Sequence, residues 1–133
     1  MVASHPTILV IDDDPDVLDA TSSLLERCFG DYARVACATG GLQALAIARA
    51  VHPDLIVCDY AMPGMDGPAF VRRARHEPSL RDVPILLHSG EPKLRELARG
   101  LDVQGWISKA ETFQRLPREA LRLLAATYER ESA

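Results

Sequence analysis

The sequence lacks a long apolar run, and this absence excludes one class of protein at once. A helix that spans a membrane needs about 20 consecutive apolar residues, and no stretch of this chain approaches that length. The first residues, MVASHPT, also lack the charged and then apolar order of a secretory signal peptide. We therefore expect a cytoplasmic protein that does not insert into a membrane.

Cysteine is scarce, and there is no excess of basic residues. The three cysteines, Cys28, Cys37 and Cys58, are odd in number and lack the spacing of a zinc site or a disulfide framework. The formal net charge is -4, from 15 basic and 19 acidic residues, whereas a protein that binds nucleic acid usually carries a basic face. The composition therefore gives no support to a direct nucleic-acid partner.

Apolar residues are plentiful, and their order predicts an α/β fold. They make up 47% of the 133 residues, enough for one domain with a core, so we expect a single domain over 1–133, with its core at about 7–128 and no output domain. Short apolar runs at 8–11, 34–38, 55–58, 84–88 and 104–108 alternate with segments of helical periodicity. This alternation predicts a doubly wound parallel sheet with helices on both faces.

Charged and hydroxyl residues follow the predicted strands at the edge where such sheets bind ligands. This edge is formed by the carboxyl ends of the strands. The polar residues that follow the first, third, fourth and fifth strands are Asp12, Asp13, Asp14, Asp59, Ser89 and Lys109. Asp14 before Pro15 is explained as a helix cap. Capping does not explain Asp12, Asp13 or Asp59, so these carboxylates are candidates for a site.

Lysine is rare in this chain, which makes Lys109 informative. Of the 15 basic residues, only Lys93 and Lys109 are lysine. Three carboxylates at neighbouring strand ends repel one another unless a divalent cation and an ammonium group offset their charge. Oxygen ligands of this kind favour Mg²⁺, which is often shared between carboxylates and a phosphate. Asp59 is then a candidate nucleophile toward phosphorus.

Four segments together resemble the receiver domain of response regulators in two-component signalling, over about residues 7–128. They are ILVIDDDPDV, ATGGLQAL, PDLIVCDYAMPGMDG and GWISK. The resemblance, which is to single-domain receivers of the chemotaxis-regulator kind, implies a flavodoxin-like five-stranded sheet with strand order 2-1-3-4-5 and five helices. It further implies a phospho-acceptor signalling module that catalyses only its own phosphorylation and dephosphorylation.

The resemblance also implies roles for individual residues. Asp59 would accept the phosphoryl group, with Lys109 and Ser89 as its catalytic partners. Ser89 and Trp106 would form the switch that changes the surface of the fourth helix, fifth strand and fifth helix. Asp12 would act mostly through water. The ligands implied for Mg²⁺ are Asp12, Asp13, Asp59 and the backbone carbonyl of Ala61.

The implied partners follow from the same resemblance. The phosphoryl donor would be a histidine kinase or a histidine phosphotransfer protein, and a downstream protein target would read the switched surface. The fourth and fifth helices could also form a homodimer.

Three positions depart from the usual family pattern. Ala110 stands where proline usually follows the lysine through a cis bond, so we predict a trans Lys109–Ala110 peptide. Trp106 is larger than the usual tyrosine or phenylalanine, so we expect that it is not fully buried on activation. The segment KAETFQRLPREAL is longer than the family's usual approach to its last helix, and we expect Pro117 in the first turn of that helix, where its missing N–H is not needed.

Two alternatives remain open from the sequence. One is a receiver-like scaffold that binds partners without phosphorylation, which the departures at 106 and 110 would permit. The other is a small phosphohydrolase that uses Asp12 and Asp14 as a D-x-D pair, although this reading leaves Asp59 unexplained.

Overall fold

A computed structural model of the chain describes residues 5–132. Five parallel strands form one sheet in the order β2-β1-β3-β4-β5, as expected. The strands are β1 (Thr7–Ile11), β2 (Arg34–Ala38), β3 (Leu55–Cys58), β4 (Ile85–Ser89) and β5 (Gly105–Ser108). The helices are α1 (Pro15–Phe29), α2 (Gly41–Val51), α3 (Gly67–Arg75), α4 (Leu94–Arg99) and α5 (Thr112–Ser132). Two short 3-10 helices, η1 (Gly30–Tyr32) and η2 (Lys109–Glu111), follow α1 and β5.

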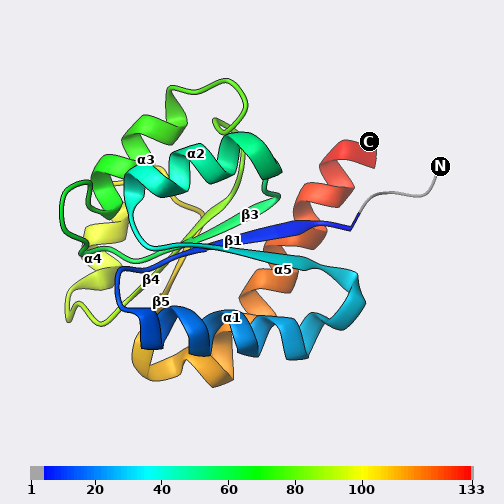
Figure 1. The fold of residues 1–133 in the computed structure, drawn as a ribbon, viewed down its shortest axis with the longest axis horizontal. Coiled ribbons are helices and arrows are strands. Elements are labelled where there is room, and N and C mark those ends of the chain that lie inside the picture. The colour runs from blue at the N-terminus through cyan, green and yellow to red at the C-terminus, as the bar shows by residue number, and fades with distance from the viewer. Residues whose placement is uncertain (1–4, 133) are drawn as a thin grey trace.

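Helices cover both faces of the sheet, which explains the continuous apolar runs of the strands. Helices α1 and α5 pack against one face, and α2, α3 and α4 pack against the other (Figure 1). Successive strand residues point to opposite faces, so Ile56 packs on the α2 side and Leu55 on the α5 side. All four residues of β3 are buried, as is typical of a central parallel strand.

Backbone hydrogen bonds extend the sheet beyond the ends of the central strands. The amide of Asp12 donates to the Ala38 carbonyl at 3.1 Å, and the amide of Asp59 donates to the Ile11 carbonyl at 3.0 Å. Asp12 and Asp59 are therefore held by the ladder itself. Their side chains emerge side by side at the carboxyl edge because β1 and β3 are neighbours in the sheet.

The last helix begins earlier than the sequence predicts, so the expectation for Pro117 was wrong. Helix α5 starts at Thr112, and Pro117 lies inside it rather than in its first turn. The fully buried side chain of Leu116 packs in the core between α5 and the sheet, which favours helix before the proline. The proline leaves the Phe113 carbonyl without its usual helical donor, and Phe113 is 70% exposed, so water can reach this turn.

The segment after β5 has the trans peptide that the sequence predicts. None of the peptide bonds in the described residues is cis, and Lys109–Ala110 is therefore trans. The chain turns there through η2, where the Ser108 side chain accepts a hydrogen bond from the Ala110 amide at 3.2 Å. This short turn places Lys109 at the same edge of the sheet as the aspartates.

Candidate functional site

Three carboxylates meet at the carboxyl edge of the sheet. One side-chain oxygen from each of Asp12, Asp13 and Asp59 lies within 4.8 Å of the others. Asp12 and Asp59 are buried, whereas Asp13 is exposed. Oδ1 of Asp12 accepts a hydrogen bond from the Asp14 amide at 2.9 Å, and Oδ1 of Asp59 accepts one from the Tyr60 amide at 2.8 Å. Each buried carboxylate therefore has one oxygen fixed by the backbone and one directed to other partners.

Lys109 supplies the positive charge of the site. Its Nζ lies 2.8 Å from Oδ2 of Asp12 and 3.3 Å from Oδ2 of Asp59. Burial lowers the pKa of Lys109, but the contacts with the two carboxylates outweigh burial and hold its pKa above the ordinary value. The lysine is therefore an ammonium ion at neutral pH, and one cation faces three carboxylates.

The electrostatics and the donor atoms of the site fit a divalent cation. Burial, followed by repulsion from Asp12, raises the pKa of Asp59, and Lys109 offsets only part of this effect. Oδ2 of Asp12 is buried, and its partner is the Lys109 ammonium at 2.8 Å. One ammonium does not balance three clustered carboxylates, and hard oxygen atoms suit an ion such as Mg²⁺. The acidic cluster is thus of the kind that binds metal.

The loop after β3 is packed tightly against the site. A Cβ atom at Gly67 would lie 2.5 Å from the Asp59 carbonyl oxygen, so only glycine fits there without a shift of the backbone. The Gly67 amide also donates to the Tyr60 carbonyl at 2.8 Å, and the Asp66 side chain caps α3. Ala61 is exposed within this fixed loop.

The two residues expected to form a switch lie on the neighbouring strands β4 and β5. Ser89 ends β4, is 2% exposed, and accepts a hydrogen bond from the Glu91 amide at 3.3 Å through Oγ. Trp106 is half-buried on β5, and the Arg115 guanidinium lies 5.7 Å from the centre of its ring. Strand β4 lies between β3 and β5. Ser89 is therefore on the strand between the one that leads to Asp59 and the one that carries Trp106.

One polar contact near the site was missed by sequence reasoning. His88 faces the side of α1 and α5, as the alternation along β4 predicts, but the sequence suggested no partner for it. In the structure its Nε2 lies 2.7 Å from Oγ1 of Thr112. No local sequence signal pairs residues on β4 and α5, because their contact depends on the way in which α5 crosses the sheet.

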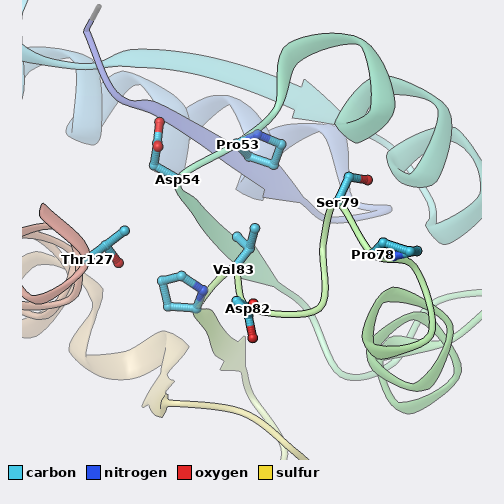
Figure 2. A pocket seen from close by; sticks show the side chains of 8 residues that line it. Pro53, Asp54, Pro78, Ser79, Asp82, Val83 and Thr127 are labelled. Carbon is cyan, nitrogen blue, oxygen red and sulfur yellow. The ribbon is translucent and has the colours of Figure 1, made fainter. Parts of the chain in front are cut away.

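A surface pocket lies at the other end of the sheet and contains none of the expected site residues. It has a volume of about 390 Å³ and lies at the amino ends of β3 and β4 (Figure 2). Its lining residues are Pro53, Asp54, Pro78, Ser79, Asp82, Val83, Pro84 and Thr127. The Asp54 side chain there accepts a hydrogen bond from the Thr7 amide at 2.8 Å, so this carboxylate anchors the start of β1.

Comparison with known proteins agrees with this geometry. The sequence matches the family model of the response regulator receiver domain over residues 8–121. It is 32% identical over 120 residues to the DNA-binding dual master transcriptional regulator RpaA of Synechocystis, covering 90% of this chain and 46% of that protein. It is 35% identical over 119 residues to the response regulator PleD of Caulobacter vibrioides, covering 89% of this chain and 24% of that protein.

Solved structures give the same result. The chemotaxis protein CheY4 of Vibrio cholerae superposes with a TM-score of 0.80 at 27% identity, covering 90% of this chain and 99% of that chain. This chain spans less than half the length of RpaA and of PleD. Within the described residues, no helix combines the length and apolar character that a membrane crossing requires. The match over residues 8–121, the strand order and the acidic cluster agree, and the chain belongs to the response regulator receiver domain family.

Proposed function

We propose that this chain is a signalling module in which Asp59 accepts a phosphoryl group from a phosphohistidine on a histidine kinase or a histidine phosphotransfer protein. One observation carries the proposal: a buried carboxylate at the end of a central strand lies within reach of both an ammonium group and two further carboxylates. A buried carboxylate costs folding free energy unless other groups offset its charge. A charge-rich acidic site of this kind suits the transfer of a phosphoryl group.

The residues of the chain have separate tasks in this reaction. Oδ1 of Asp59 is held by the Tyr60 amide, and Oδ2 faces Lys109. A carboxylate oxygen of Asp59 forms a bond to phosphorus while the bond from phosphorus to the donor imidazole nitrogen breaks, and that nitrogen keeps the electron pair. The Lys109 ammonium stabilises negative charge on the phosphoryl oxygens.

Asp12, Asp13, Asp59 and the backbone carbonyl of Ala61 would hold Mg²⁺ in this proposal. The ion would supply positive charge that offsets the carboxylates and the phosphoryl oxygens. The donor set fits, because the carboxylate oxygens lie together and a single ammonium does not balance their charge.

The proposed output is a change at the surface of α4, β5 and α5. A phosphoryl group on Asp59 brings new acceptor oxygens beside Ser89, whose hydroxyl can donate to one of them. The movement of Ser89 would open space toward Trp106, whose ring lies under the Arg115 guanidinium in the described structure. A downstream protein, or a second copy of the chain, would then bind the altered surface.

The phosphohydrolase alternative has little support from the geometry. It needs Asp14 as a catalytic group, yet Oδ1 of Asp14 accepts hydrogen bonds from the amides of Asp16 and Val17 at the start of α1. Asp14 is exposed and acts as a helix cap. Lys109 pairs with Asp12 and Asp59 instead.

The intact mass of the protein after incubation with acetyl phosphate and Mg²⁺ tests the proposal. We expect the wild type to gain the mass of one phosphoryl group, and Asp59→Asn to gain none. Asp14→Asn serves as the control, because it removes a nearby carboxylate that the proposal leaves out of the chemistry. If the folded wild type gains no mass, and beryllofluoride leaves the Trp106 fluorescence unchanged, the chain is a scaffold that acts without phosphorylation.

A further inference from the structure

A buried histidine lies next to the proposed switch serine. His88 is 3% exposed and precedes Ser89 on β4. A buried ring nitrogen needs a hydrogen-bond partner, and Nε2 of His88 finds one in Oγ1 of Thr112, at 2.7 Å. Thr112 is the first residue of α5. The contact therefore joins a central strand to the start of the last helix.

The Thr112 hydroxyl continues this contact to the backbone of Lys109. Its Oγ1 donates to the Lys109 carbonyl at 3.0 Å. A hydroxyl group has one hydrogen, so a hydroxyl that donates to Lys109 must accept from His88. His88 therefore carries its proton on Nε2. The result is a directional chain of hydrogen bonds from β4 through Thr112 to Lys109.

The position of the Lys109 backbone is critical because its side chain has far to reach. Lys109 follows the edge strand β5, whereas Asp59 follows β3 and Asp12 follows β1, with β4 between β5 and both of them. The ammonium must cross the end of β4 to meet the two carboxylates at 2.8 and 3.3 Å. A shift of the backbone at residue 109 would be transmitted to both contacts.

One side of the turn that carries Lys109 faces a cavity. A cavity of about 350 Å³ lies between α1 and the beginning of α5, and both His88 and Lys109 line it. The peptide after Lys109 is trans and belongs to a single turn of 3-10 helix. Because one side of the turn faces this cavity, the hydrogen bonds of Thr112 and of the Ser108 side chain help to hold the lysine backbone in place.

We infer that His88 and Thr112 are positioning residues, which hold Lys109 in place for phosphoryl transfer to Asp59. This inference rests on the proposed function. Neither side chain is required to touch the phosphoryl group. Burial, followed by the charge of Lys109, lowers the pKa of His88 to about 4. The imidazole is therefore neutral at neutral pH. It can donate a hydrogen bond from Nε2 without adding a second positive charge near the Lys109 ammonium.

The first test compares phosphorylation rates with acetyl phosphate and Mg²⁺. Thr112→Val removes the hydroxyl at similar volume, and we expect the rate to fall by about 10- to 100-fold, the range expected for a misplaced catalytic group. Thr112→Ser keeps the hydroxyl and should restore the rate. Thr127→Val is the matched control, since Oγ1 of Thr127 donates to the Leu123 carbonyl at 3.0 Å in the same helix, away from Lys109. Its rate should stay near that of the wild type.

Coupling between the two positioning residues provides a second arm of this test. His88→Gln keeps an amide N–H that can donate to Thr112, whereas His88→Leu removes the donor. We expect the double variant His88→Leu, Thr112→Val to be no slower than Thr112→Val alone, because both changes break the same chain of hydrogen bonds. If the two substitutions lower the phosphorylation rate independently, so that their effects multiply in the double variant, the two residues do not act through one chain of hydrogen bonds.

A measurement that does not depend on phosphorylation separates the positioning role of His88 and Thr112 from the proposed phosphorylation of Asp59. NMR can follow hydrogen exchange of the Lys109 ammonium, and its assignment is simple because Lys93 is the only other lysine. We expect slow exchange in the wild type and in Thr112→Ser, and faster exchange in Thr112→Val. If the wild type is never phosphorylated, the proposed function fails, and the exchange data still decide whether Thr112 positions Lys109. Unchanged exchange in Thr112→Val, with only a loss of thermal stability like that of Thr127→Val, would overturn the inference.

Discussion

Removal of the Asp59 charge should stabilise the folded protein when no divalent cation is present. Burial and the neighbouring Asp12 raise the pKa of Asp59. A carboxyl group whose pKa is raised on folding binds its proton more tightly in the folded state, so its ionised form opposes folding at neutral pH. Asp59→Asn keeps the shape of the side chain and removes this cost.

The distances in the site give the size of the effect. At an effective dielectric constant of about 20, charges 4.8 Å apart interact by about 3.5 kcal/mol, and charges 3.3 Å apart by about 5 kcal/mol. Repulsion from Asp12 offsets most of the attraction of Lys109, so the burial of the Asp59 carboxylate, the largest cause of its raised pKa, remains as a net cost. Solvent screens the exposed Asp13 and part of Lys109. We therefore expect Asp59→Asn to raise the free energy of unfolding by about 1 to 2 kcal/mol.

Urea denaturation in chelator and in Mg²⁺ measures this effect. Asp31→Asn is the control, because Asp31 is an exposed aspartate in η1, away from the acidic cluster. In chelator, Asp59→Asn should be the more stable protein, and Asp31→Asn should match the wild type. Mg²⁺ at ten times its dissociation constant should stabilise the wild type by about 1.4 kcal/mol and the variant by much less.

Two results would show that Asp59 does not behave in this way. If Asp59→Asn is less stable than the wild type in chelator, the ion pair of Asp59 with Lys109 stabilises the fold by more than the buried charge destabilises it. If Mg²⁺ stabilises both proteins equally, Asp59 is not among its ligands.

Three further predictions concern the loop after β3, the segments before β4 and β5, and the buried histidine. Gly67→Ala places a Cβ atom 2.5 Å from the Asp59 carbonyl oxygen, so it should lower the free energy of unfolding in urea by about 1 to 3 kcal/mol. Arg75→Met removes the guanidinium that donates to four backbone carbonyls between α3 and β5, and should cost about 2 to 3 kcal/mol in the same assay. For His88, the folded pKa of about 4 lies below the ordinary 6.5. The unfolded chain therefore binds more protons between these values, and stability should fall by up to about 3 kcal/mol as the pH falls through this window. His88→Gln should lack this component.

Each of these predictions has a matched comparison. Gly100→Ala is the control for the loop, because a Cβ there would meet only an ordinary contact at 3.7 Å. Equal losses of stability in Gly67→Ala and Gly100→Ala would show that the close approach of Gly67 to the Asp59 carbonyl has no special effect. Arg72→Met is the control for the guanidinium, since Arg72 is exposed on the same helix. A pH dependence that is identical in the wild type and in His88→Gln would show that other groups dominate acid unfolding.

Periodicity predicted the fold because each element buries one consistent face. The apolar run at 55–58 became a fully buried central strand, and Asp59 was placed correctly at its end. Strands β2 and β3 have the bounds that the sequence predicts. The strand expected at 84–88 lies one residue later, at Ile85–Ser89, since Pro84 has no N–H to give to the sheet.

Contacts between distant elements could not be predicted from the sequence. Helix α5 begins before Pro117 because Leu116 is buried against the sheet, and this burial depends on the tertiary packing. The contact of His88 with Thr112 has the same origin. The proximity of Lys109 to Asp59 was predictable, because the carboxyl ends of parallel strands meet at one edge of the sheet.

Asp59 is the proposed phosphoryl acceptor, and chemical mapping of the modified residue tests this role. After incubation with acetyl phosphate and Mg²⁺, borohydride reduces an aspartyl phosphate to homoserine, and peptide mass spectrometry locates the changed residue. We predict homoserine at residue 59 and unmodified aspartate at Asp12, Asp13 and Asp14. Homoserine at any of these three positions, or at no position of a folded protein, would show that Asp59 is not the phosphoryl acceptor.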